Sequence, residues 1–341
     1  MNKNTTGNSN TASGSYSLRN NTTGTRNIAM GYGALDAADT ENDNLAIGYD
    51  ALGGSIAGGE FNLAIGNYVL DANTSGDYNV ALGNQAMSAN TTGESNLAIG
   101  HVALGSNTTG NYNVGVGQST LNGNTTGLRN TSLGYGALDA PDTENDNLAI
   151  GYDALGGSIA GGEYNAAVGN YALDALTSGD GNTGAGYNAM TALTTGSGNV
   201  SLGRASGTTI TTGSNNTVIG KGADVSANSG TNQIVIGQGA TGHGDNIAVI
   251  GNGSATAIHP HDNNEVDLGS SSYKFKNLHL AGSVIVGVAS TITSSATFNG
   301  NETIIPINPS SGNITLTIDS DQKIAGRIII IKQISIRERF G

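Results

Sequence analysis

The sequence predicts an all-β fold, a parallel β-solenoid of about 15 coils with a repeat of about 17 residues. Three observations predict it. A short motif of Asn, apolar, small, apolar and Gly recurs through the chain. Glycine occupies 54 of the 341 positions, and only 11% of residues are charged, against about 25% in a typical globular protein. Because aromatic residues make up 5% of the chain and tryptophan is absent, each coil must have a thin core.

The recurring motif is the strongest signal in the sequence. It reads NIAMG at 27–31 and NLAIG at 44–48, and its closing glycine returns about every 17 residues. Helical hairpin repeats need about 33 residues or more, so this period favours a solenoid coil. We interpret the asparagine and closing glycine of each copy as the structural repeat residues; they include Asn27, Gly31, Asn44, Gly48, Asn62, Gly66, Asn79, Gly83, Asn96, Gly100, Asn147 and Gly151.

Each coil is predicted to contain two strands and two corners. The motif alternates large, small and large residues, which is the period-2 pattern of a strand with unequal faces. The closing glycine supplies a tight corner. A second small-apolar pair follows, as at Ala34-Leu35 and Ala51-Leu52, and is expected to form a second strand. The return corner is usually Thr-Thr-Gly, as at 22–24 and 91–93.

Stacking of the coils should align the asparagines, whose side-chain amides then bond from coil to coil as a ladder. Each coil supplies only four or five aliphatic side chains by our reading of the repeat, too few to offset its chain entropy comfortably. We therefore expect one face of the solenoid to be buried against copies of the same chain.

The bulk composition narrows the classes of partner and environment. The formal net charge of −13 argues against nucleic acid and anionic membranes as partners, because both require clustered Lys and Arg. The sequence has no cysteine and no run of about 18 apolar residues, so it predicts neither disulfides nor membrane insertion. No cofactor is expected.

The repeat resembles the head repeats of YadA-type trimeric autotransporter adhesins. The resemblance rests on the Asn-x-Ala-Ile-Gly motif with its following small-apolar pair, and covers roughly residues 8–256. It implies a left-handed parallel β-roll assembled as a homotrimer.

The next segment, EVDLGSSSYKFKNLHLAGSVIVG from Glu265, resembles the segment before the C-terminal chaperone of endosialidase-type bacteriophage tail fibres. The final segment, with ITLTID and GRIIIIK, is similar to small β-modules of phage receptor-binding proteins. We predict a solenoid over 1–256, a neck over 257–289 and a small C-terminal β-module over 290–341. Because the chain stops soon after a predicted strand, we expect either a truncated reading frame or one piece of a longer fibre.

These features favour a structural and adhesive role without enzymatic activity. The leading hypothesis is a phage tail-fibre segment on the virion, extracellular and homotrimeric, that presents a surface to a host-cell glycan or protein receptor. The alternative is a trimeric autotransporter-type adhesin on a bacterial surface. A polysaccharide depolymerase is disfavoured, because the Asp and Glu residues lie mostly in corners without aromatic platforms for sugar rings. An ice-binding solenoid is disfavoured because the threonines lie beside glycine in corners.

Two further candidate sites are weighed against simpler interpretations. The acidic corners at 39–43 and 142–146, Asp39 to Asp43 and Asp142 to Asp146, could bind Ca²⁺, but a solvated loop is favoured because the order of an EF-hand is missing. His259 and His261 would place six imidazoles near the axis of a trimer, where a metal could bind. Solvated linker histidines are the favoured interpretation there.

Overall fold

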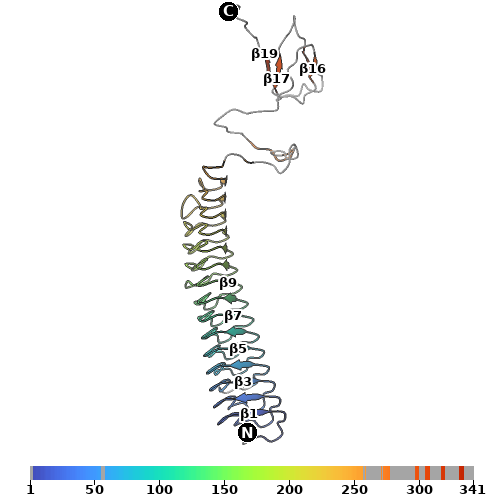
Figure 1. Ribbon diagram of the computed structural model, residues 1–341, viewed down its shortest axis with the longest axis vertical. Helices are drawn as coiled ribbons and strands as arrows, with labels where there is room; N and C mark the ends of the chain where they lie inside the picture. The colour runs from blue at the N-terminus through green and yellow to red at the C-terminus, as the bar shows by residue number, and fades with distance from the viewer. Residues whose placement is uncertain are drawn as a thin grey trace, which may run out of the picture. The chain divides into compact units, whose positions relative to one another are not determined.

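The computed structural model describes residues 3–54 and 58–255, residues 258, 270 and 272–276, and four short strands nearer the C-terminus (Figure 1). The chain divides into two compact units, 1–258 and 259–341. The first unit is a parallel β-solenoid, and its coils are stacked along one axis from the N-terminus onward.

One sheet of fifteen strands runs the length of the solenoid, in chain order from β1 to β15, so about fourteen turns join its strands. Every neighbouring pair is parallel and in register, for example Leu45 beside Leu63. The strands are β1 (Thr11–Ser13), β2 (Ile28–Met30), β3 (Leu45–Ile47), β4 (Leu63–Ile65), β5 (Val80–Leu82), β6 (Leu97–Ile99), β7 (Val114–Val116), β8 (Thr131–Leu133), β9 (Leu148–Ile150), β10 (Ala166–Val168), β11 (Thr183–Ala185), β12 (Val200–Leu202), β13 (Thr217–Ile219), β14 (Ile234–Ile236) and β15 (Ala248–Ile250). The all-β class, the parallel solenoid and the repeat of about 17 residues are confirmed.

The second unit contains two parallel strand pairs. Strand β16 (Ala296–Phe298) pairs with β18 (Leu316–Ile318), and β17 (Ile304–Ile307) pairs with β19 (Ile330–Gln333). These strands lie in the segment for which a small β-module was predicted. The predicted neck, 257–289, falls mostly outside the described residues and stays a prediction.

The small residue in the middle of each strand faces the interior, and the large residues on either side of it face outward. Ala46 and Ala98 are fully buried, whereas Ile28 and Met30 are 39% and 45% exposed. The unequal faces of the predicted strand are therefore real, and the bulky face is the outer one. The inward residue is Ala, Gly or Ser in β2 to β12, where the interior also holds the leucine or methionine of a turn, and Val218 and Val235 take this position in β13 and β14.

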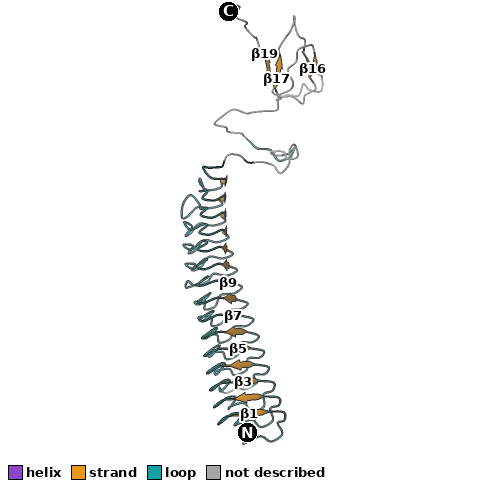
Figure 2. Cartoon of the chain, viewed as in Figure 1, coloured by secondary structure: helices purple, strands orange, loops and turns teal. Residues whose placement is uncertain are grey.

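The predicted second strand is wrong. The pairs Ala34-Leu35 and Ala51-Leu52 lie in turns, and both residues of each pair are fully buried. An extended strand sends successive side chains to opposite faces, so two adjacent inward side chains require a bend. Leu35 supplies this bend with a φ of 48° and Leu52 with the same value. Figure 2 shows the result, a single stripe of strands with loops and turns completing every coil.

The leucine of each such pair forms the main aliphatic column of the core. The largest fully buried side chains are Leu18, Leu35, Leu52, Leu70, Met87, Leu104, Leu121, Leu138, Leu155, Leu173, Leu176 and Met190. Backbone bonds run along this column too, as from the Leu35 N–H to the Ala51 carbonyl at 3.0 Å. Alanine and leucine together thus make the thin core that the composition predicts.

Candidate functional site

The repeat asparagines form a continuous hydrogen-bonded ladder inside the solenoid. The backbone N–H of Asn96 donates to Oδ1 of Asn79 at 3.0 Å, and its Nδ2 donates to the Gly110 carbonyl at 2.8 Å. Oδ1 of Asn96 in turn accepts the N–H of Asn113 at 2.9 Å. These side chains are at most 2% exposed. The ladder that the repeat predicts is therefore present, and it joins each coil to the coils on both sides.

A second asparagine ladder was not foreseen from the sequence. Nδ2 of Asn107 donates to Oδ1 of Asn90 at 2.8 Å, and Nδ2 of Asn124 donates to Oδ1 of Asn107 at the same distance. Each of these asparagines also donates to the carbonyl of the glycine three residues later. The signal was available, because an asparagine precedes the Thr-Thr-Gly corner at 90, 107 and 124.

The twelve repeat residues singled out from the sequence occupy two columns of the solenoid. The asparagines lie just before the strands, and the closing glycines lie just after them. A Cβ at Gly66 would lie 2.6 Å from the Gly83 carbonyl oxygen, and the φ of Gly66 is 135°. This backbone conformation is essentially restricted to glycine. The structure therefore gives both columns an architectural role.

The acidic corners are built around a buried glutamate. Glu41 is 3% exposed, and its carboxylate accepts the N–H groups of Asp39 at 2.7 Å, Thr40 at 3.0 Å and Gly58 at 3.0 Å. Glu144 repeats the arrangement in the second acidic corner. The favoured interpretation as a solvated loop is wrong for these two residues, because each carboxylate fastens its corner to a glycine of the next coil.

The last residue of each acidic corner is paired with an arginine. Arg26 donates from Nε and Nη2 to the two carboxylate oxygens of Asp43 at 2.6 Å, and Arg129 contacts Asp146 in the same way at 2.7 Å. Hydrogen bonding from these guanidinium groups lowers the pKa of Asp43 and of Asp146. The carboxylates of Asp43 and Asp146, which a bound cation would need as ligands, are therefore already paired with arginines.

Metal binding finds no further support in the described part of the chain. No group of three or more His, Asp or Glu side chains there could hold a metal ion. His259 and His261 lie outside the described residues, so their predicted solvated state is untested.

Two outward columns of aliphatic residues cover the face of the long sheet. In addition to Ile28 and Met30, the exposed large side chains of the strands include Ile99, Leu133, Val168, Val200, Leu202, Ile234 and Ile250. Because the strands are in register, these side chains and the half-buried aliphatic residues of the other strands lie in two columns along the solenoid, interrupted by polar or small residues such as Thr131, Thr183 and Ala185.

Stacked tyrosines line a second part of the surface. Tyr32 and Tyr49 are 46% and 42% exposed, with ring centroids 5.1 Å apart and ring planes 8° apart. Tyr135 and Tyr152 repeat the pair at 5.2 Å and 8°. The sequence-based argument that aromatic platforms are missing is therefore wrong. The signal that could have revealed them is the tyrosine directly after the closing glycine.

Carboxylates flank both tyrosine pairs and crowd one another. Desolvation, followed by repulsion from Asp153, raises the pKa of Asp139. Desolvation and repulsion from Asp174 raise the pKa of Asp153. In the other copy, desolvation and repulsion from Asp50 raise the pKa of Asp71. The surface beside the tyrosines is therefore strongly acidic.

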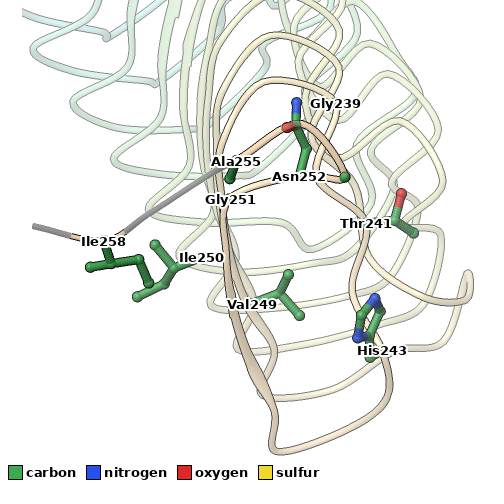
Figure 3. A pocket seen from close by; sticks show the side chains of 10 residues that line it. Gly239, Thr241, His243, Val249, Ile250, Gly251, Asn252, Ala255 and Ile258 are labelled. Carbon is green, nitrogen blue, oxygen red and sulfur yellow. The ribbon is translucent and has the colours of Figure 1, made fainter. Parts of the chain in front are cut away.

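A pocket of about 590 Å³ lies at the C-terminal end of the solenoid (Figure 3). Its lining combines the apolar Val249, Ile250 and Ile258 with His243 and Asn252. The Asn252 side chain is already engaged, since its Nδ2 donates to the Gln238 carbonyl and its Oδ1 accepts the N–H of Ser254. The pocket lies beside β15, the last strand of the long sheet, and its lining residues offer no arrangement of acid, base and nucleophile.

Within the described part of the chain, the structure contains no helix with the length and hydropathy needed to cross a membrane. No protein-family model, curated protein or solved structure matches the chain.

Proposed function

We propose that the chain is a structural fibre segment that assembles with copies of itself through the aliphatic face of its sheet. The observation that carries this proposal is the outward orientation of the large strand residues. A solenoid with a thin alanine and leucine core leaves the large aliphatic side chains at the two outward positions of its strands partly in water unless a partner covers them. Contiguous apolar surface of this extent is typical of interaction sites.

The size of this face fits an interface between chains. Fourteen coil spacings of about 4.8 Å give a length of ~67 Å, and a three-residue strand spans ~10 Å. The resulting area of ~670 Å² approaches the ~800 Å² that each partner buries in a standard stable interface. An identical copy is the simplest partner, because its face has the same length and the same spacing. We propose a homotrimer, as the resemblance to YadA-type head repeats implies.

In this proposal the fibre belongs to a phage tail and presents its remaining surface to a host glycan or protein receptor. Three identical chains would combine individually weak contacts into avid binding. The alternative is a bacterial surface adhesin of the trimeric autotransporter type. Neighbouring genes separate the two: tail and baseplate genes favour the phage fibre, whereas an export signal in the complete reading frame favours the adhesin.

Light scattering on the intact chain tests the assembly. We expect a mass three times that of one chain at micromolar concentration. Replacing Leu82 and Ile99, which lie on neighbouring strands, with lysine should shift the mass toward one chain without unfolding the coils, because the two charges would have to be desolvated at the interface.

The matched control places the same charges elsewhere. Thr92 and Thr109 lie in neighbouring corners and are exposed, so the double variant Thr92→Lys and Thr109→Lys should keep the wild-type mass. A monomeric wild-type chain, or equal dissociation of both double variants, would contradict assembly through the sheet face.

A further inference from the structure

The two duplicated parts of the solenoid differ at one charged position beside their tyrosines. Residues 21–72 and 124–175 agree at about 43 of 52 positions, offset by 103 residues. In the coil before the first copy stands Arg19, and the equivalent position before the second copy is Asn122. This difference removes a positive charge beside a carboxylate, Asp36 or Asp139, that both copies have.

In the first copy the arginine occupies a place made by a carboxylate and an aromatic ring. Nη2 of Arg19 lies 3.3 Å from Oδ2 of Asp36, and its guanidinium carbon lies 5.1 Å from the centroid of the Tyr16 ring. Tyr16 also meets Tyr32 edge-on, with centroids 5.3 Å apart. A guanidinium is attracted both to the carboxylate and to the π-system. The first copy thus pairs this carboxylate with an arginine of its own chain.

In the second copy the corresponding place has kept its acids and has lost both the arginine and the tyrosine over which it lies, because Asn122 and Ser119 stand where the first copy has Arg19 and Tyr16. Asp139 replaces Asp36 and forms no ion pair with any described Lys or Arg. A Cβ added at Gly136 would overlap Oδ1 of Asp153 and lie 4.0 Å from Oδ2 of Asp139, so both carboxylates border the space over this glycine. The side chain of Asn122 points the other way, with its Oδ1 2.7 Å from where a Cβ of Gly105 would lie.

The ring of Tyr135 in the second copy also has fewer aromatic neighbours than the ring of Tyr32 in the first copy. Ser119 stands where the first copy has Tyr16, so Tyr135 lacks the aromatic neighbour that Tyr32 has on that side. Tyr135 is 48% exposed, and on its other side it stacks on Tyr152. One side of the Tyr135 ring is therefore free of aromatic contact among the described residues, next to an acid that lacks a counter-ion.

We propose that Tyr135, Asp139 and Asp153 form a binding site for an arginine side chain of a protein partner. A planar guanidinium can lie against the ring while its N–H groups donate to the two carboxylates. The internal precedent is the ion pair of Arg19 with Asp36, the counterpart of Asp139, and it favours a guanidinium at this carboxylate. The inference deepens the proposed function, on which it rests for the presence of a protein receptor, and the site itself is complete within one chain.

Calorimetric titration of the intact chain with a blocked tetra-arginine peptide at low ionic strength tests the site. We expect one peptide per wild-type chain. Asn122→Arg should weaken binding at least 10-fold, because its own guanidinium would pair with Asp139 as that of Arg19 pairs with Asp36. Arg19→Asn should raise the stoichiometry to two peptides per chain, because it frees the Asp36 carboxylate and the Tyr16 ring for a guanidinium of the peptide.

The matched control for charge is Thr92→Arg, an exposed corner residue away from both tyrosine pairs, which should bind like the wild type. Circular dichroism and light scattering on the same samples report folding and assembly, so loss of the fibre is distinguishable from loss of the site. Equal binding by Asn122→Arg and Thr92→Arg, an unchanged stoichiometry in Arg19→Asn, or binding of a glucosamine tetramer in place of the peptide would each overturn the proposal.

Discussion

Each ladder asparagine makes hydrogen bonds in three directions, which explains why this residue type recurs. Asn96 donates from its backbone N–H to Asn79 and from its Nδ2 to Asn79 and Gly110, and its Oδ1 accepts from Asn113, so its partners belong to the coils before and after its own. Its amide matches both the donor and the acceptor of the neighbouring backbone, a combination that neither aspartate nor leucine provides. Burial then makes each of these bonds costly to lose.

Asn96→Ala should lower the free energy of unfolding by about 2–3 kcal/mol, because it leaves the Asn113 N–H and the Gly110 carbonyl buried without these partners. Chemical denaturation measures the change. Gln118→Ala provides the control, since Gln118 is exposed, and its effect should stay within about 0.5 kcal/mol. Equal stability of the two variants would show that the ladder does not stabilise the fold.

Glu41 has a comparable role in the acidic corner. Glu41→Ala removes the acceptor for three backbone N–H groups, and we expect a loss of about 2–3 kcal/mol by the same argument. Glu60, whose carboxylate accepts only from Asn42 at 2.6 Å, is the matched control, and Glu60→Ala should cost less. Amide hydrogen exchange of Thr40 and Gly58 should rise in Glu41→Ala and not in Glu60→Ala; unchanged exchange in Glu41→Ala would contradict this role.

Each coil has little space inside, and the alternation of side chains along a strand limits which of its residues can fill that space. The strand places one small residue in the interior, and the following turn places two more residues there, as Ala98 and the pair Ala103-Leu104 show. Left-handed backbone at Leu104, with a φ of 52°, makes this possible. The coils stacked on both sides keep such residues in this strained backbone conformation.

Gly66→Ala should disrupt the corner of its coil, because the added Cβ meets the Gly83 carbonyl and the φ of 135° disfavours any other residue. We expect a loss of at least about 3 kcal/mol, or no folded protein at all. Gly222→Ala is the control: its φ is 64°, and an added Cβ would meet nothing within 4 Å. Thermal unfolding that ranks the two variants equally would refute the packing argument.

The whole solenoid carries a formal charge of −13 on a narrow structure, and its stability should therefore respond to pH. Desolvation raises the pKa of Asp36, Asp71, Asp139 and Asp153 in the folded chain. The folded chain consequently binds protons more tightly at these groups than the unfolded chain does, whose Asp pKa is about 3.9.

Stability should rise as the pH falls from 7 through the raised pKa values of these groups. Below about pH 3.9 it should fall again, because Asp43, Asp146 and Asp245, whose pKa values are lowered, lose their hydrogen-bonded ionised form there. Denaturation at pH 7 and pH 5 measures the first effect. Asp139→Asn should be more stable than the wild type at pH 7 and should gain less at pH 5. A steady loss of wild-type stability from pH 7 to pH 5 would contradict the prediction.

Much of this architecture could be predicted from periodicity. The spacing of Asn and Gly predicted the solenoid, its period and the asparagine ladder, because a repeat that stacks in register must place identical residues over one another. The second ladder at Asn90, Asn107 and Asn124 was equally periodic, but its asparagines lie in corners that read as ordinary turns. The tyrosine pairs were missed because a tyrosine after a glycine does not by itself predict stacking. The rings come together only when neighbouring coils lie in register.

The sequence by itself determined the solenoid, because its 17-residue period leaves room for only one kind of coil. Only the tertiary structure decided which side chains are inside. The motif pairs a small residue with two large ones, and either face could have been buried until the inward leucine of the turn filled the interior and left the alanine side as the only fit. The same stacking placed Asp139 and Asp153 around Gly136, a juxtaposition of residues 14 positions apart that depends on coil geometry and not on any local pattern.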